Sequence, residues 1–315
     1  MKLRSLMALL AGALAATLQA APVPAPLQLT DDRGTRIEQR APERVAAIST
    51  FAADSLVALG VKPVGASTFG DRPVPDFLGP VMDGVPSLGQ RAGTNLELLS
   101  ELQPELILAI RRYTEPHARQ FEAIAPFYAF DVISYADSLR AVAGIGAALG
   151  KAQEGEKLNN AFEAKVADYG ARAPGGISAV LLAGSGEAPF AYYNHFLSAG
   201  LLGRLRATNA PGPSPTPEQP IPFGYQISLE QLLVLDPDVI FLFASSTRHA
   251  YADNPIWPHL KAVREGRVYE VGLHWKEGGG PIARNLILEE MAWRLYPDRF
   301  ERPEVPDSIA SRPFQ

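Results

Sequence analysis

The feature that most constrains this fold is a short sequence that occurs twice, at residues 95–107 and 228–240. The first copy reads NLELLSELQPELI and the second reads SLEQLLVLDPDVI. Aligned without gaps, the copies share three leucines, one glutamate, one proline and one isoleucine. Each copy predicts a short helix that ends before the proline and leads into a buried strand. A chain that contains this unit twice is expected to fold as two related lobes.

Short apolar segments typical of buried strands alternate with helical patterns on both sides of the chain's middle. Residues 44–50 and 62–67 are strand-like, and the helical segment between them ends at Gly60. A strand, a helix and a strand in this order form a crossover, which favours a parallel sheet. The predicted fold class is therefore α/β, with two Rossmann-like lobes that are joined by one long backbone helix.

The joining helix is predicted over residues 137–173. Apolar residues recur there mostly at helical spacing, and no proline interrupts them. Glycines at positions 144, 146, 150 and 155 have low helix propensity, so a break within 150–155 is the alternative. The predicted divisions are a signal peptide at 1–20, an N-terminal lobe at 21–136, the helix, a C-terminal lobe at 174–300, and a polar, proline-containing, poorly ordered tail at 301–315.

The N-terminus has the parts of a secretory signal peptide. Lys2 and Arg4 carry positive charge, an apolar run covers residues 6–17, and the small side chain of Ala20 suits cleavage. An uncleaved membrane anchor is the alternative, although the run is short for a membrane span. The chain has no cysteine, so it forms no disulfide and lacks the residue that carries the lipid of bacterial lipoproteins. We expect a soluble monomer in the periplasm.

Composition and motifs argue against several other classes of function. The formal net charge is −5, which argues against nucleic acid as a partner. The histidines form neither H-x-H nor H-E-x-x-H, so we expect no protein-bound metal and no resident cofactor. A secreted α/β enzyme is a remote alternative, because the sequence lacks a G-x-S-x-G elbow, a phosphate-binding loop and a cysteine nucleophile.

Taken together, these segments resemble the helical-backbone class (class III) of periplasmic substrate-binding proteins of ABC transporters. The resemblance covers nearly all of the mature chain and rests on RVAAIST, NLELLSELQPELILA, the central helix, SLEQLLVLDPDVIFL and HWKEGGGPIARNLILEEMAW, in this order. The class serves importers of ferric siderophores, haem and cobalamin. AIRRY and APFYAF are similar to the ferric-siderophore branch, of which the ferric-citrate type is one. The resemblance implies a ligand cleft between the lobes, iron that arrives inside its chelator, and a dimeric permease in the inner membrane.

Ligand contacts are expected at the carboxyl ends of the parallel strands, where ligands gather in α/β folds. Arginine offers a planar fork of donors to carboxylates and catecholates, and aromatic rings offer contact area. Both suit a bulky anionic ferric siderophore. The predicted ligand-binding residues are Phe69, Arg72, Arg111, Arg112, Tyr113, Tyr192, Tyr193, Arg248 and Trp275.

Several of these residues have alternatives. Arg111 and Arg112 are adjacent, so we expect only one to face the cleft, and we favour Arg112. Only one of Tyr192 and Tyr193 is expected to reach a ligand, and core packing is the alternative for Trp275. A haem or cobalamin binder of the same class also stays open, since Tyr193 or His195 could serve as an axial ligand of haem iron.

The glutamate that both repeat copies keep, Glu97 and Glu230, is predicted to dock on the permease. A dimeric permease presents its receptor surface twice, and the resemblance implies two docking glutamates that meet arginines there. The alternative is that each glutamate only favours the start of its helix. Capping boxes are expected from Thr94 with Glu97 and from Ser228 with Gln231.

Overall fold

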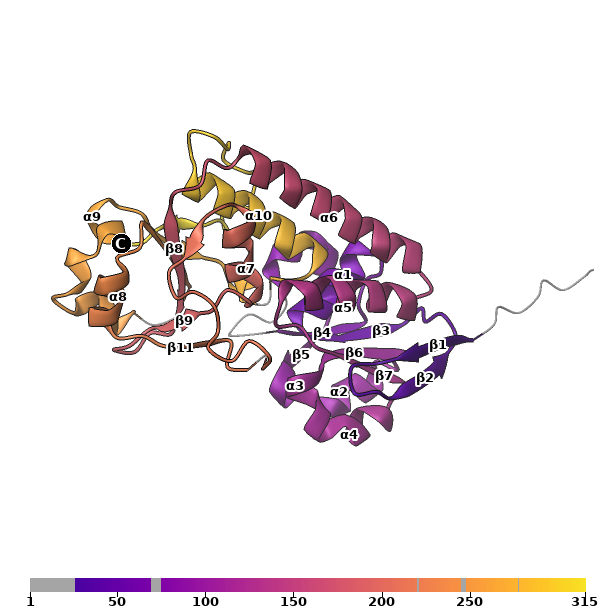
Figure 1. Cartoon of the computed structure of the whole chain (residues 1–315). Helices are drawn as coiled ribbons and strands as arrows, with labels where there is room; N and C mark the ends of the chain where they lie inside the picture. The colour runs from indigo at the N-terminus through magenta and orange to yellow at the C-terminus, as the bar shows by residue number, and fades with distance from the viewer. Residues whose placement is uncertain (1–25, 69–74, 220, 245–247, 277) are drawn as a thin grey trace, which may run out of the picture.

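The computed structural model describes residues 26–68, 75–219, 221–244, 248–276 and 278–315 (Figure 1). Phe69, Arg72 and the predicted signal peptide lie outside these residues. Two sheets form two lobes, with helices lying across and between them (Figure 1). The prediction of a two-lobed α/β fold is confirmed. No helix in the described part of the chain is long and apolar enough to cross a membrane.

The N-terminal lobe is built on a parallel five-stranded sheet in the order β5-β4-β3-β6-β7. An antiparallel hairpin of β1 (Leu27–Thr30) and β2 (Arg36–Gln39) precedes it. Its strands are β3 (Val45–Ile48), β4 (Gly65–Thr68), β5 (Ser87–Gln90), β6 (Leu106–Ile110) and β7 (Phe127–Phe130). Its helices are α1 (Thr50–Ala58), α2 (Leu96–Glu101), α3 (Arg111–Thr114) and α4 (Ala118–Glu122).

The C-terminal lobe has a mixed sheet in the order β11-β9-β8-β12-β13-β14, with β10 beside β8. Strands β8, β12 and β13 are parallel, and β9, β11 and β14 are antiparallel additions. The strands are β8 (Ser178–Ala183), β9 (Phe190–Tyr192), β10 (Thr208–Asn209), β11 (Gly224–Gln226), β12 (Val239–Phe243), β13 (Val268–Val271) and β14 (Arg312–Pro313). The helices are α7 (Leu197–Arg204), α8 (Leu229–Leu235), α9 (Lys261–Arg264) and α10 (Pro281–Leu295).

The two repeat copies form the same unit, α2 followed by β6 and α8 followed by β12. The capping box of α8 is confirmed, because the Ser228 hydroxyl accepts from the Gln231 backbone N–H at 3.2 Å and the Gln231 side chain bonds back. The box predicted for α2 is wrong by one residue. Asn95 caps this helix by accepting from the Leu98 N–H at 3.0 Å, while the Thr94 hydroxyl turns back to a backbone carbonyl. Asparagine accepts such a bond as readily as threonine.

The single joining helix is corrected to two helices, α5 (Tyr135–Ala148) and α6 (Ala152–Arg172). The chain turns between them at Gly150, whose φ of 71° favours glycine. The helices then pack side by side (Figure 1). A Cβ on Gly146 would lie 3.2 Å from the Gly155 Cα and 2.9 Å from the Lys151 carbonyl oxygen. These glycines therefore serve the close approach of two helices as well as the turn.

This close approach predicts that Gly146→Ala destabilises the protein. The added methyl group meets backbone atoms, which cannot rotate away, so α5 and α6 must separate at a cost of about 1–3 kcal/mol. The free energy of unfolding in urea would report the loss. Gly203→Ala in α7 is the matched control, because no atom lies within 4 Å of its added Cβ. Equal stability of the two variants would contradict the packing argument.

Helix α10 belongs to the C-terminal half of the chain but is capped by a residue of the N-terminal lobe. The two carboxylate oxygens of Asp54, in α1, accept from the backbone N–H groups of Ile282 and Ala283 at 2.7 and 2.8 Å. Burial raises the pKa of the Asp54 carboxyl to about 7, although the two hydrogen bonds act in the opposite direction. A Cβ on Gly280 would lie 2.3 Å from this carboxylate, so only glycine lets the start of α10 come this close to Asp54.

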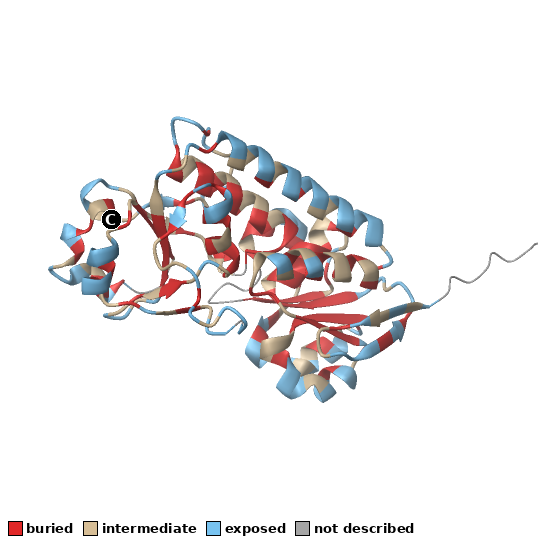
Figure 2. Ribbon diagram, in the orientation of Figure 1, coloured by how far each residue is buried: buried red, intermediate tan, exposed pale blue. Residues whose placement is uncertain are grey.

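Arg284 continues this polar junction between the lobes. Its guanidinium donates to the Ser138 hydroxyl of α5 at 3.2 Å and to the Asn159 side chain of α6 at 2.8 Å. The Ser138 hydroxyl in turn donates to the Gly279 carbonyl. Buried apolar residues from both lobes also form one contiguous cluster, and Figure 2 shows buried strands and helix faces continuing through the middle of the molecule. The lobes are therefore joined by buried polar contacts and by a shared apolar core.

The tail at 301–315 was predicted to be poorly ordered, but it packs on the C-terminal lobe. Strand β14 adds to the edge of the C-terminal sheet beside β13, and the Ser311 N–H donates to the buried Glu290 carboxylate at 2.6 Å. Phe314 packs against Trp257 with ring centroids 6.1 Å apart. The polar, proline-containing composition of the tail suggested disorder. It hides a few residues that pair with the edge of the sheet.

Candidate ligand-binding site

Three basic side chains and two tyrosines gather where the lobes meet. From the N-terminal lobe, Arg91 begins the short 3-10 helix Arg91–Gly93 after β5, and Arg112 and Tyr113 lie in α3 after β6. From the C-terminal lobe come Tyr192 at the end of β9 and Lys276 after the 3-10 helix Leu273–Trp275. Each of the five lies at the end of a strand or in the segment that follows one. This is where ligands gather in α/β folds.

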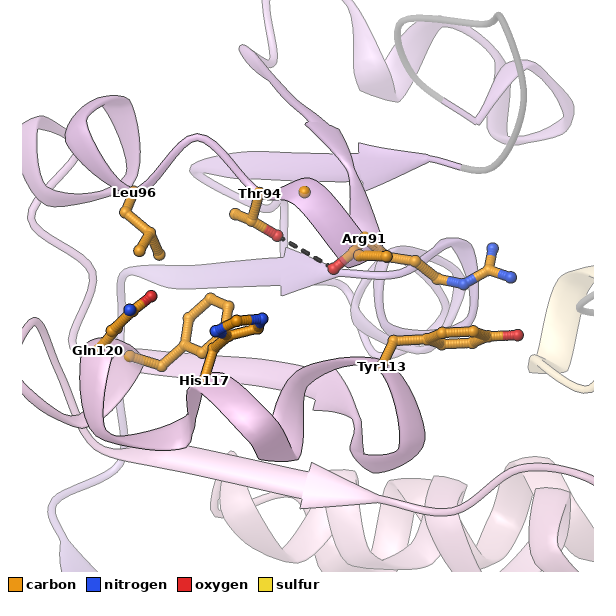
Figure 3. Close-up of a pocket in the computed structure, with 9 residues that line it drawn as sticks. Arg91, Thr94, Leu96, Tyr113, His117 and Gln120 are labelled. Atoms are coloured by element: carbon orange, nitrogen blue, oxygen red, sulfur yellow. Dashed lines mark hydrogen bonds between the residues drawn. The ribbon is translucent and has the colours of Figure 1, made fainter.

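Tyr113 is the centre of the N-terminal part of the site. The guanidinium carbons of Arg91 and Arg112 lie 4.0 and 4.7 Å from its ring centroid. Figure 3 shows the Arg91 and Tyr113 side chains extending side by side. Burial would raise the pKa of Tyr113, but the positive charges of Arg112 and Arg91 and their hydrogen bonds outweigh it, and the pKa lies below its usual value. The environment of this hydroxyl therefore favours negative charge.

The two predicted arginines of α3 have different partners. Arg111 donates from Nε and from one terminal nitrogen to the same Asp131 carboxylate oxygen, at 2.9 and 2.7 Å, and its guanidinium lies 3.6 Å from the Glu115 carboxylate. Arg112 donates to the Val132 carbonyl at 2.8 Å and to the Tyr113 hydroxyl, and its Nε is buried without an acceptor. Arg112 therefore keeps donor capacity that Arg111 has already used.

Tyr192 supplies the C-terminal counterpart of Tyr113. It is buried in an aromatic group, with ring centroids 4.1 Å from Phe196 and 5.4 Å from Phe243. Burial raises the pKa of its hydroxyl, and the charge of Tyr113 in the other lobe adds to the rise. The neighbouring Tyr193 turns the other way and stacks on Tyr225 at 5.2 Å, half-exposed.

Lys276 brings a third positive charge. Its ammonium lies 5.7 Å from the Phe243 ring centroid. Burial lowers the pKa of Lys276, and the positive charge of Arg91 in the other lobe lowers it further. Two cations from different lobes therefore repel each other across the boundary, and a negative charge placed between them would relieve that repulsion.

Sequence reasoning missed Arg91 and Lys276. The strand that precedes Arg91, at residues 87–90, is short and has only one fully buried residue, so it gave no clear apolar pattern. Had it been recognised, the strand-end rule would have pointed to Arg91. Lys276 follows the predicted Trp275 directly, but lysine is mostly exposed in proteins, so its residue type alone does not mark a site.

Other predicted residues lie elsewhere. Trp275 is completely buried: its ring centroid is 5.1 Å from that of Phe241 and its indole N–H donates to Glu290 at 3.3 Å. It offers no surface to a ligand, so the core-packing alternative holds. The Arg248 side chain is 78% exposed and pairs with Asp253. The burial of Trp275 corrects its prediction, whereas Arg248, at the surface, stays a prediction.

A pocket of about 250 Å³ adjoins the Arg91 and Tyr113 pair on the N-terminal lobe (Figure 3). It lies between the segment that starts α2 and the helices that follow β6. Its remaining lining includes Thr94, Leu96, His117, Gln120 and Phe121. In the described ranges, no group of three or more His, Cys, Asp or Glu side chains is placed to hold a metal ion.

The predicted docking residues are both at the surface. Glu97 and Glu230 are exposed, and each is the second residue of its helix. The Glu230 carboxylate accepts from its own backbone N–H and from the Ser228 hydroxyl, and these bonds lower its pKa. Both glutamates are therefore accessible to a partner.

Comparisons with known proteins agree with this architecture. A family model described as periplasmic binding protein matches residues 45–272. The chain is 30% identical over 281 residues to the putative ABC transporter substrate-binding lipoprotein YhfQ of Bacillus subtilis, covering 84% of this chain and 86% of that protein. It is 29% identical to the probable siderophore-binding lipoprotein YfiY of the same organism, covering 79% and 81%.

The fold is also similar to that of solved structures. Staphylococcus aureus SirA, solved in complex with staphyloferrin B, superposes with a TM-score of 0.70 at 22% identity, covering 85% of this chain and 97% of that one. The matched family consists of binding proteins, in agreement with the expectation that this chain is not an enzyme. The chain therefore belongs to the periplasmic binding protein family, in the branch whose two α/β lobes are joined by helices.

Proposed function

We propose that this protein captures a ferric siderophore between its lobes in the periplasm and delivers it to an ABC importer of the inner membrane. The observation that carries the proposal is the group formed by Arg91, Arg112 and Lys276 around Tyr113. Three cations on two lobes suit a ligand with several negative charges that contacts both lobes. The tyrosines add aromatic area and hydroxyl donors.

The comparisons support iron chelates as the ligand class. YfiY is named a probable siderophore-binding protein, and SirA was solved with staphyloferrin B. In this proposal the chelator holds the iron, so the protein needs no metal ligands of its own. The relatives named above are lipoproteins, whereas this chain contains no cysteine and starts with a signal-like segment. We therefore propose a soluble periplasmic monomer.

Titration with a panel of ligands tests the function. Ferric citrate and ferric hydroxamate, catecholate and mixed siderophores would be added to purified protein while tryptophan fluorescence is followed. Trp275 lies next to Lys276, so a ligand held there should quench it. We expect at least one anionic ferric chelate to bind with a Kd near or below about 1 μM, which corresponds to −8.2 kcal/mol. Binding of neutral cobalamin alone would contradict the proposal.

Haem is the second candidate, because Tyr193 and His195 lie together with ring centroids 6.3 Å apart, and both are half-buried. A haem ligated by either residue would give a shifted Soret band on addition of haemin, which Tyr193→Phe or His195→Ala would alter. Such a band, with no binding of ferric siderophores, would favour haem over the proposed ligand.

A further inference from the structure

The pocket in Figure 3 runs between two walls of the N-terminal lobe. One wall is formed by residues 91–96, which follow β5 and begin α2, and the other by residues 113–121, which extend from α3 into α4. In Figure 3 the Arg91 and Tyr113 side chains lie at one end, and Leu96 and Gln120 lie at the other. Arg91 and Tyr113 also belong to the proposed ligand site, so the pocket is an extension of that site.

Both walls are held in place by contacts that need no ligand. The Thr94 hydroxyl donates to the Arg91 carbonyl at 3.3 Å, which fixes the turn before α2. On the other wall the Phe121 ring is buried and stacks on Phe127, with ring centroids 5.0 Å apart. The pocket is therefore a feature of the folded lobe that exists before a ligand arrives.

The lining combines apolar surface with a few polar groups, which is the usual composition of a small-molecule site. Leu96 and Phe121 supply the apolar part. His117 and Gln120 are exposed, and neither side chain takes part in a hydrogen bond among the described residues. An imidazole and an amide can each donate and accept. Among the described residues that line the pocket none is acidic, so it suits a neutral or anionic group better than an amine.

The size of the pocket limits what it can hold. Its volume is about 250 Å³, whereas an apolar cavity of about 150 Å³ already admits benzene. One aromatic ring with a short polar end therefore fits. A ligand that met only the three cations of the site would leave this volume to water.

We propose that the ferric chelate taken by this protein carries a pendant arm outside its iron-binding part, and that this pocket binds the arm. The arm is about the size of one aromatic ring and ends in a neutral or anionic hydrogen-bonding group. This inference rests on the proposed function and narrows its ligand class. The cations of the two lobes would hold the charged centre of the chelate, while His117 and Gln120 would select among chelates by the arm.

Removing both polar side chains tests this selection. His117→Ala with Gln120→Ala changes exposed residues, so the melting temperature should equal that of wild type. Ferric citrate and ferric hydroxamate, catecholate and mixed siderophores would be titrated against both proteins. We expect the chelate that binds wild type most tightly to carry such an arm. The double variant should bind it about tenfold or more weakly, because two hydrogen bonds to the arm are lost.

Ferric citrate is the matched ligand, because it has no arm of this size and should bind both proteins with the same affinity. Gln153→Ala with Asn160→Ala is the matched control variant, because both residues are exposed on α6. It should bind every chelate as wild type does. A structural role of the replaced residues would weaken all chelates by the same factor. Such uniform weakening, unchanged affinity for the tightest chelate, or tightest binding of ferric citrate would each overturn the inference.

Failure of the underlying function would look different. If wild-type protein bound no ferric chelate of the panel, the proposed function would fall and the inference with it. Chelate binding that depends on Arg91 and Lys276 but not on His117 and Gln120 would leave the function standing and remove only the role of the pocket.

Discussion

Replacing Arg91 and Lys276 together by methionine should weaken binding of an anionic ferric chelate by about 10²- to 10⁴-fold. Each change removes one charge-assisted contact, worth about 1.5–3 kcal/mol, and each 1.4 kcal/mol is a factor of ten. Methionine keeps much of the side-chain length, so the aromatic surroundings stay filled. The two cations come from different lobes and repel each other in the unliganded protein, which offsets part of the stability lost with the contact between Arg91 and the Tyr113 ring.

Calorimetric titration with the chelate that binds wild type best would measure this effect. Arg172→Met is the matched control, because Arg172 lies on α6 in an exposed pair with Asp168. It should bind the chelate normally. If the double variant kept wild-type affinity while remaining folded, the ligand site would have to lie elsewhere.

The second large effect is expected from Glu97→Ala together with Glu230→Ala. Uptake through the transporter should fall by about tenfold or more, since two charge-assisted contacts to the permease are lost. Chelate affinity should stay unchanged, because both residues are exposed on helices outside the group around Tyr113. Transport of radioactive iron and titration of the purified protein measure the two quantities separately.

A variant that removes only the helix caps distinguishes docking from capping. Asn95→Ala with Ser228→Ala deletes the side chains that accept from the first turns but keeps both glutamates. This variant should lose about 0.5–2 kcal/mol of stability per site and retain uptake. If the glutamates also served only their helices, the two double variants would behave alike, with lower melting temperatures and persistent uptake.

The sequence predicted the elements whose signal is local. The repeat gave α2, β6, α8 and β12 correctly, because a capping residue, an apolar run and a proline are read within a few positions. The Ser228 cap was found and the Asn95 cap was missed by one residue, since two adjacent side chains could each accept the same bond. The glycines near 146 lowered the expected helicity. Their role in packing α5 on α6 could not be predicted, because it depends on which helix lies beside them in the folded protein.

Prediction of the site depended on long-range geometry and was less complete. Arg112 and Tyr113 were found from the end of a clear strand, whereas Arg91 follows a strand too short to recognise. For Trp275 the residue type left two readings open, because an aromatic residue suits both a ligand site and a core. Its long-range neighbours decide between them, since the indole N–H donates to the buried Glu290 carboxylate. Likewise, nothing in the tail indicated that its backbone would complete the C-terminal sheet.

The cap that Asp54 provides to α10 also determines the order in which this chain can fold. Asp54 and Ala283 are 229 residues apart in sequence, and the first lobe shares its apolar core with α10. Contacts of such long range form late, because most of the chain must first be present and its loop entropy lost. A chain that emerges from its N-terminus therefore stays incompletely folded until nearly all of it has appeared.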